Sequence, residues 1–115
     1  MSKRSAELLL QDILEAIEKI EQYTSNFSQQ QFISDTKTID AVVRNLEILG
    51  EATYRLPTVF KEKYPKIEWH KIIGLRHRIV HEYFGIDLYL VWIIIQKDLP
   101  SFKKDLLQIL KAPGV

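Results

Sequence analysis

The residues best suited to do chemistry lie in the run Arg-His-Arg-Ile-Val-His-Glu-Tyr at positions 76–83. This run holds two arginines, two of the three histidines in the chain and one tyrosine. Cleavage of a phosphodiester needs a cation beside the non-bridging oxygens and a group that exchanges protons near neutral pH. Arginine and histidine supply these functions without a metal, so Arg76 and His81 form a candidate catalytic pair.

The spacing of this pair sets a geometric condition on the site. Five residues along an ideal α-helix rotate by about 140° net, so Arg76 and His81 would not share one face of a regular helix. Either the helix ends or distorts near His81, or a two-fold axis brings the motifs of two chains into one cleft.

Helical periodicity dominates the segments that must position these residues. Apolar residues recur every three or four positions in three long stretches, at residues 5–23, 32–56 and 69–84. A capping-box pattern at Ser28-Gln-Gln-Gln31 marks the start of the second helix, and residues 34–36 could split that helix in two. No strand-like alternation is visible, so we predict an all-α fold, an antiparallel bundle of four to five helices.

Prolines, a glycine and an aspartate mark the remaining boundaries. Pro57 suits the first turn of a short helix. Pro65 keeps the residue before it out of helical geometry, so this short helix has to end before Pro65. Gly85 is a natural stop for the helix that carries the motif, and Asp87 can cap a last helix. Pro100 inside that last helix predicts either a kink or the first turn of a second segment.

Composition limits the class of protein. A chain of 115 residues fits one domain, which we assign to residues 1–115. The absence of cysteine excludes disulfides and cysteine-ligated zinc. The first residues lack the apolar core of a signal peptide, and the longest apolar run, Leu88–Ile95, is too short to cross a bilayer. We therefore expect a cytoplasmic protein in which that run is a core segment or an interface.

Charge is distributed unevenly, although the net charge is only +1. Residues 1–54 carry five Lys/Arg against nine Asp/Glu, residues 55–78 carry seven against two, and residues 79–115 carry four of each. The basic middle segment adjoins the motif, where it would attract an RNA backbone, although it could equally be a solvated face. Within it, Lys71 and Arg78 are the candidate RNA-binding residues.

The motif and two other blocks resemble one known family. The sequence of Arg76, four residues, His81, one residue and Tyr83 resembles the Arg-x4-His-x-Tyr motif of HEPN-domain ribonuclease toxins of the HepT type. Two further blocks look like those of the same family, in order and at similar spacing: Arg44-Asn-Leu-Glu-Ile-Leu-Gly-Glu-Ala52 and Pro65-Lys-Ile-Glu-Trp-His-Lys-Ile-Ile-Gly-Leu75. Three blocks in register are much more specific than the motif alone.

The resemblance implies a function, a set of roles and a partner. It implies a metal-independent endoribonuclease toxin without a cofactor, whose cleft forms across a homodimer of helical bundles, and on this ground we favour the two-chain arrangement. Arg76 and His81 would be catalytic, with His77 and Tyr83 as active-site support. The family's partner is a minimal nucleotidyltransferase antitoxin, which in some type VII-like toxin–antitoxin systems transfers AMP to the motif tyrosine, here Tyr83.

Ordinary structural roles remain open for the same residues. His81 could be a hydrogen-bonded core histidine, and Arg76 could pair with a carboxylate such as Glu51. His77 and His81 have a spacing that can bind a metal, but no third ligand is evident nearby, so no metal site is predicted.

A second function is also compatible with the sequence. The chain could be a non-catalytic helical dimer that binds a nucleotidyltransferase partner or a nucleotide through the same arginines and histidines. Arg78 could form an ion pair with Glu82, four residues on. Trp69 and Trp92 are interpreted as packing residues rather than base-stacking platforms.

Overall fold

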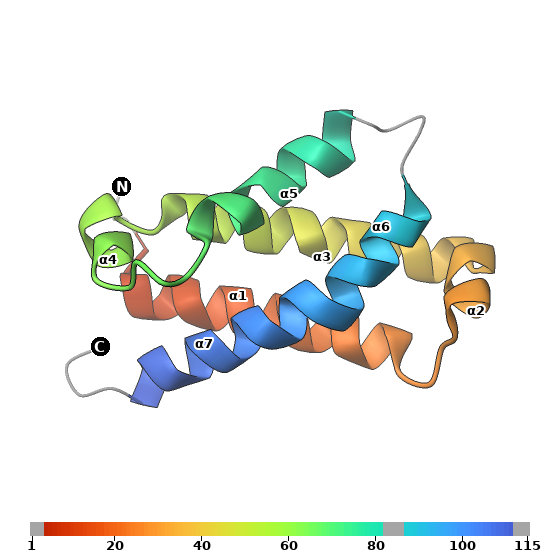
Figure 1. Ribbon diagram of the computed structural model, residues 1–115, viewed down its shortest axis with the longest axis horizontal. Coiled ribbons are helices and arrows are strands. Elements are labelled where there is room, and N and C mark those ends of the chain that lie inside the picture. Colours follow the sequence, from red (N-terminus) through yellow and green to blue (C-terminus); the bar gives the residue numbers. More distant parts are fainter. Residues whose placement is uncertain (1–3, 82–86, 112–115) are drawn as a thin grey trace.

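The computed structural model describes the backbone of residues 4–81 and 87–111, and the side chains of residues 4–75 and 87–111. In these parts of the chain all regular structure is helical, which confirms the all-α prediction (Figure 1). The elements are α1 (Ala6–Thr24), α2 (Gln29–Ser34), α3 (Thr36–Arg55), α4 (Thr58–Glu62), α5 (Trp69–His81), α6 (Leu88–Ile93), the π-helical turn η2 (Ile94–Asp98) and α7 (Leu99–Lys111).

Local hydrogen bonds explain where α1, α2 and α3 begin. The Ser5 hydroxyl accepts a bond from the backbone N–H of Leu8 at the start of α1. The predicted capping box is present, because Ser28 and Gln31 satisfy each other's backbone N–H groups at 2.8 and 3.1 Å. Asp35 ends α2 and also caps α3, so the second predicted helix is two helices.

The structure also shows what happens at Pro57 and Pro100. Pro57 directly precedes α4, the short helix that was predicted there. Pro100 lies in the first turn of α7, directly after the π-helical turn η2. Proline has no N–H, and its ring would clash with the carbonyl of Gln96, four residues earlier in that wide turn. Pro100 therefore marks the start of a second segment rather than a break in the chain direction.

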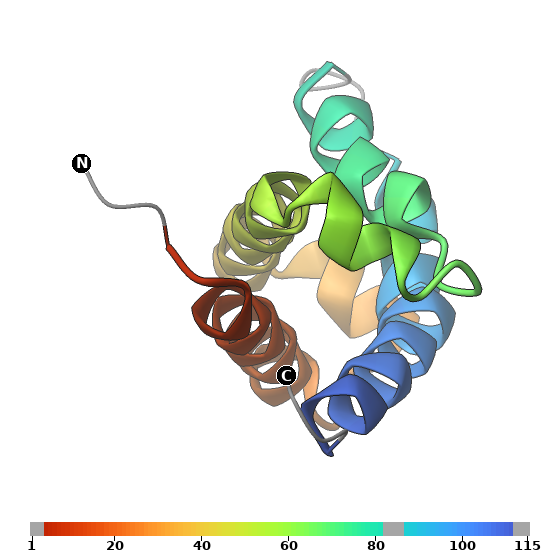
Figure 2. The same ribbon diagram turned by 90° about the vertical axis from the view of Figure 1, so that its left-hand side faces the viewer.

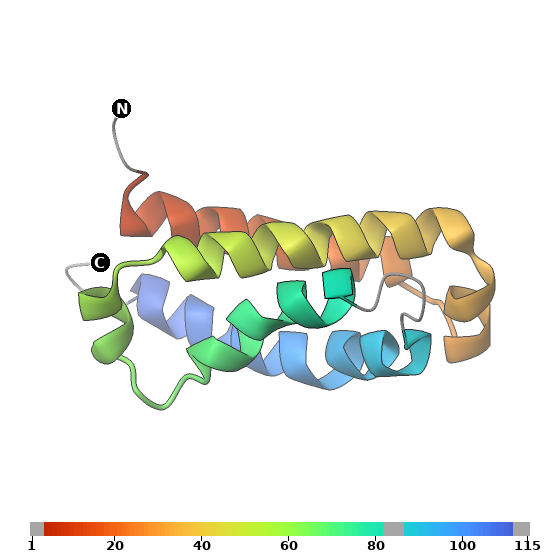
Figure 3. The same ribbon diagram turned by 90° about the horizontal axis from the view of Figure 1, so that it is seen from above.

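The long helices pack as an antiparallel bundle (Figures 1 and 3). α1 packs mainly against α3, and α3 also packs against α5. The line of α6, η2 and α7 runs back along the other side, where α7 meets α1. Viewed from the end, these segments surround a shared apolar core (Figure 2). None of the described helices is long and apolar enough to cross a membrane.

The apolar run of α6 and η2 is divided between the core and the surface. Val91, Ile94 and Ile95 are buried, whereas Tyr89 is 54% and Ile93 46% exposed. Asp87 caps α6 by accepting a bond from the N–H of Leu90 at 3.1 Å, as the sequence predicts. The predicted stop at Gly85 lies outside the described residues.

Candidate functional site

The motif lies on the second half of α5. The backbone at positions 76, 77, 78 and 81 belongs to this helix, which the structure describes as far as His81. The side chains of Arg76, His77, Arg78 and His81 lie outside the described residues, and so does the whole of Tyr83. What the structure defines is therefore the helix that carries the motif, its register and the residues that hold it.

One side of α5 is held firmly in the bundle. Trp69, Ile72 and Leu75 are 7%, 4% and 1% exposed and follow each other at helical spacing. The indole Nε1–H of Trp69 donates to the carbonyl oxygens of Lys61 at 3.1 Å and Tyr64 at 3.2 Å. These bonds tie the start of α5 to the end of α4 and the turn that follows it.

The Trp69 ring also joins α5 to α7. It meets the ring of Phe102 edge to face, with centroids 5.9 Å apart and planes at 87°. It also lies 6.4 Å from the ring of Phe60 on α4. Aromatic pairs prefer particular ring orientations, and they stabilise the packing beyond what the burial of apolar surface contributes. Trp69 is thus a packing residue, as predicted, and it holds the start of α5 against α4 and α7.

The two sequence blocks that precede the motif meet in space. The block at residues 44–52 lies on α3, and the block at residues 65–75 contains the start of α5, which packs against α3. Leu46 and Leu49 on α3 are fully buried, as is Leu75 on α5. These blocks therefore build the support for the motif rather than separate sites.

The outward side of α5 is rich in histidine. With about 100° of rotation per residue, positions 70, 74, 77 and 81 fall within an arc of about 60° on the helix. This arc is nearly opposite the buried side marked by Trp69, Ile72 and Leu75. All three histidines of the chain and Gly74 occupy it, and no acidic residue occurs between Trp69 and His81.

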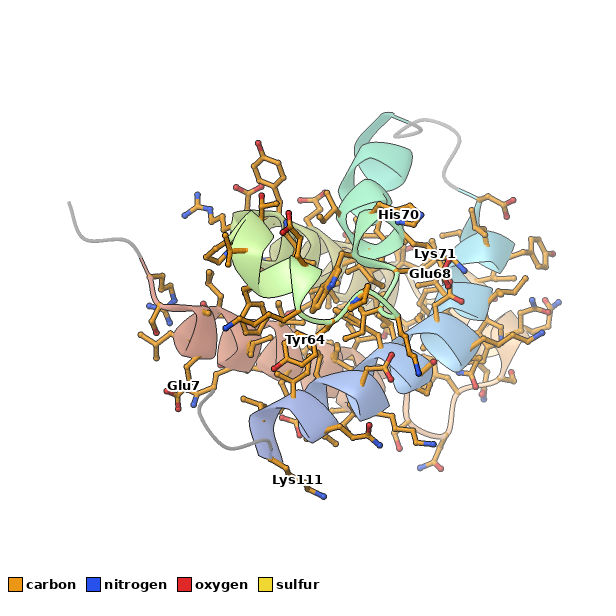
Figure 4. The ribbon with its side chains drawn as sticks, turned by 60° about the vertical axis from the view of Figure 1, so that its left-hand side comes forward. Glu7, Tyr64, Glu68, His70, Lys71 and Lys111 are labelled. Carbon is orange, nitrogen blue, oxygen red and sulfur yellow. The ribbon has the colours of Figure 1, made fainter. Side chains whose placement is uncertain are left out.

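His70 is the residue that the sequence interpretation missed. It is exposed on α5, close to Lys71 and Glu68 (Figure 4). The helical period alone places it in register with His77 and His81, seven and eleven residues later, but the packing of α5 is needed to show that this side faces outward. It was overlooked because the motif run starts at Arg76, six residues further along the chain.

Arg76 occupies a different side of the same helix. Its position is in register with Trp69, seven residues earlier, and lies about 140° around the helix from His81. The backbone is α-helical from one residue to the other. Because α5 is not distorted between them, one chain places the two positions on separate sides.

Lys71, one of the two candidate RNA-binding residues, lies close to an acidic side chain. The Nζ of Lys71 lies 3.9 Å from Oδ1 of Asp98 in η2, and the lysine side chain is 46% exposed. A polar groove of about 320 Å³ surrounds this pair, between the start of α5 and the start of α7. It is lined by three lysines and three acids, namely Lys66, Lys71, Lys97, Glu68, Asp98 and Asp105. The groove as a whole is thus nearly neutral.

Glu51, the carboxylate suggested as an ordinary partner for Arg76, accepts a hydrogen bond from a residue of its own helix. Arg55 donates from Nε to Oε1 of Glu51 at 3.1 Å, four residues apart on α3. Among the residues described with side chains, no group of three or more histidines or acids is arranged to hold a metal ion.

Comparisons with known proteins identify the family. The family model described as Ribonuclease HepT-like matches residues 13–109. The chain is 40% identical over 105 residues to "Putative RNase MJ1380" of Methanocaldococcus jannaschii, covering 91% of this chain and 96% of that protein. It is 43% identical over 101 residues to "Probable ribonuclease HepT" of Thermococcus cleftensis, covering 88% and 92%. No solved structure matches the chain. The resemblance carried by the three sequence blocks is confirmed, and the chain belongs to the HepT-like ribonuclease family.

Proposed function

We propose that this protein is a metal-independent endoribonuclease whose catalytic pair is Arg76 and His81, supported by His77 and Tyr83. The observation that carries the proposal is the architecture of α5. Its buried side is fixed by Trp69, Ile72 and Leu75, and its sequence contains no acidic residue that would repel a phosphate. The relatives named as ribonucleases support the same activity.

The reaction follows from the chemistry of the two side chains. His81 takes the proton of a ribose 2′-hydroxyl, and the 2′ oxygen then bonds to the adjacent phosphorus. The bond from phosphorus to the 5′ oxygen breaks, and that oxygen takes up a proton as it leaves. Arg76 stabilises the negative charge that develops on the non-bridging oxygens. The products are a cyclic phosphate, which water can open to a 3′-phosphate, and a 5′-hydroxyl.

The active form in this proposal is a homodimer. Positions 76 and 81 differ by about 140° around a regular helix, and α5 is α-helical across both. A two-fold axis beside α5 would bring two copies of the motif together, so that one cleft holds arginine and histidine from both chains.

Regulation by a nucleotidyltransferase partner belongs to the same proposal. In a toxin–antitoxin system of this kind, a minimal nucleotidyltransferase would transfer AMP to the hydroxyl of Tyr83. The bound nucleotide would place a negative charge and a bulky group two residues from His81, where the RNA phosphate has to lie. Modification and substrate binding would then exclude each other.

Cleavage of RNA in the presence of excess chelator tests the activity directly. We expect the wild-type protein to cut total RNA or tRNA, and His81→Ala and Arg76→Ala to reduce the rate at least about 100-fold, as loss of a general base or a charge-stabilising group does. Mapping the new ends should reveal cyclic or 3′-phosphates.

The controls separate chemistry from folding. Circular dichroism and sedimentation should give the same helix content and the same mass for wild type and both variants. Lys104→Ala, on the exposed surface of α7, should cut RNA at the wild-type rate. If unmodified wild-type protein cuts no RNA, the enzyme proposal is wrong, and a non-catalytic subunit that binds the nucleotidyltransferase becomes the better account.

A further inference from the structure

The middle of α5 contains a glycine that the packing of the chain does not require. Among the residues described with side chains, no heavy atom lies within 4 Å of a Cβ atom added at Gly74. Glycine is less favourable than alanine inside a helix, because it loses more backbone freedom on folding. Glycine also lets another molecule approach the backbone closely. The helix is therefore weakened at a point where the described packing gains nothing from a glycine, and where a molecule outside the chain could approach the backbone.

Gly74 lies on the same outward arc as His70 and His81. It follows His70 by four residues and precedes His81 by seven, so the three positions fall within about 40° of one another around the helix. His70 and His81 are separated by about 16 Å along the axis, at 1.5 Å per residue. The arc thus extends along the helix from the exposed imidazole of His70 to the position of His81, the proposed general base.

The charge of this surface fits a polyanion better than a second protein chain. Lys71 and Arg78 lie in register with each other along one flank of the arc, and α5 itself has no acidic residue. Glu68 precedes the helix, Asp98 lies 3.9 Å from Lys71, and Glu82 directly follows His81 in the sequence, so the acids lie at the two ends of the helix and not along it. Protein interfaces deplete charge and enrich large apolar groups at their centre, whereas His70, Lys71 and Gly74 offer none.

We propose that single-stranded RNA lies along the outward arc of α5, with its backbone passing over Gly74 and a flanking nucleotide contacting His70. The inference rests on the proposed ribonuclease function for the placement of the cleaved bond at His81. His70 is then a substrate-binding residue outside the motif. Its imidazole can donate to a phosphate oxygen or stack on a base.

Binding of an uncleavable RNA tests this inference apart from catalysis. The probe is a fluorescein-labelled, fully 2′-O-methylated single-stranded RNA of mixed sequence, titrated with the purified protein in chelator and followed by anisotropy. A 2′-O-methyl group cannot attack phosphorus, so the readout is affinity alone. We expect His70→Ala to weaken binding about fivefold, the value of one hydrogen bond, and Gly74→Leu to weaken it about tenfold or more.

Gly74→Ala should change stability and RNA affinity in opposite directions, a result that misfolding cannot produce. Because the added Cβ meets no atom of the described side chains, the thermal midpoint should rise while RNA affinity falls. The control is Gln11→Leu, which adds a leucine at an exposed position on α1 and should leave affinity unchanged. Sedimentation of each variant should give the wild-type mass.

Three results would overturn the inference. Wild type could fail to bind the RNA, the Gly74 and His70 variants could bind as tightly as wild type, or Gly74→Leu could change the mass of the assembly without changing RNA affinity. The last result would assign the arc to contact between copies. Cleavage of ordinary RNA by wild type is measured separately, so a protein that binds in this way but cuts nothing would contradict only the catalytic proposal.

Discussion

Trp69 illustrates how a single side chain can determine where a motif points. Its indole lies at the first position of α5 and contacts α4, the turn after α4, and α7. An indole N–H that is buried needs a partner, and here it has two carbonyl acceptors. The residue is not part of the motif, yet the packing of this ring helps to fix the rotation of α5 about its axis, and so which of its residues face the core.

Replacing Trp69 with phenylalanine should destabilise the fold measurably. The variant keeps most of the apolar contact but leaves the carbonyls of Lys61 and Tyr64 without the indole donor, so we expect a loss of about 1–2 kcal/mol in the free energy of unfolding. Urea unfolding measures the change. Trp92→Phe is the control, because that ring packs on Phe32 with centroids 5.4 Å apart and phenylalanine preserves an aromatic contact there. Equal losses in both variants would contradict the special role of the indole N–H.

At the level of elements, the connection between α2 and α3 depends on one residue. The Asp35 backbone N–H donates to the carbonyl of Phe32 at 3.1 Å and ends α2. Its carboxylate accepts from the N–H of Thr38 at 3.0 Å and starts α3. Phe32 is fully buried, so this corner holds α2 against the core.

Asp35→Ala should lower the free energy of unfolding by about 1 kcal/mol, since it removes an N-cap from a 20-residue helix. Asp35→Asn should lose only a few tenths, because an asparagine side chain caps nearly as well. Chemical denaturation of the three proteins under one condition provides the comparison. A loss for asparagine as large as that for alanine would show that the carboxylate charge, not the cap, is what matters.

The sequence predicted helix boundaries well because their causes are local. Ser28 with Gln31 and Asp87 before Leu90 are short-range patterns, and each makes the predicted bond. The break at Asp35 stayed open in the sequence because the same aspartate can be a mid-helix residue or a cap. The π-helical turn before Pro100 was not predicted, since the clash of a proline ring can be relieved by a kink, a new helix start or a wider turn.

The candidate site was predicted less completely, for a different physical reason. Arg76 and His81 stand out by type and spacing, but which side of α5 faces outward depends on Trp69, Ile72 and Leu75 packing against distant helices. Until that side is known, His70 is only an isolated histidine within the basic segment at residues 55–78. Tertiary packing turns it into part of an outward arc.

For the whole molecule, one long-range contact links the two ends of the sequence. The Nζ of Lys103 on α7 donates to Oε1 of Glu21 on α1 at 2.8 Å, across 82 residues. This hydrogen bond raises the pKa of Lys103 above its ordinary value of 10.5, against the opposing effect of partial burial. The pair reinforces the packing of α1 on α7 from the surface.

The stabilisation by this pair should depend on pH in a definite direction. A pKa raised by folding means that the contribution is complete below the unfolded value of 10.5 and is lost as pH rises through the higher folded value. Lys103→Met should therefore cost about 0.5 kcal/mol near neutral pH, a small value because both side chains are partly exposed. The gap between variant and wild type in urea midpoint should shrink in strongly alkaline buffer. A gap that stays constant would mean that lost packing, not charge, is the cause.

The seating of Trp69 has a mechanical consequence. A helix is a stiff rod, and from Trp69 to His81 this rod is about 18 Å long at 1.5 Å per residue. A tilt of about five degrees at the seated end would move the far end by roughly 1.6 Å, and errors of about 1 Å can slow a reaction about 100-fold. Mutations around Phe60, Trp69 and Phe102 should therefore shift the far end of α5 as well as lower stability, and in the proposed ribonuclease they should slow turnover even under conditions where the fold is intact.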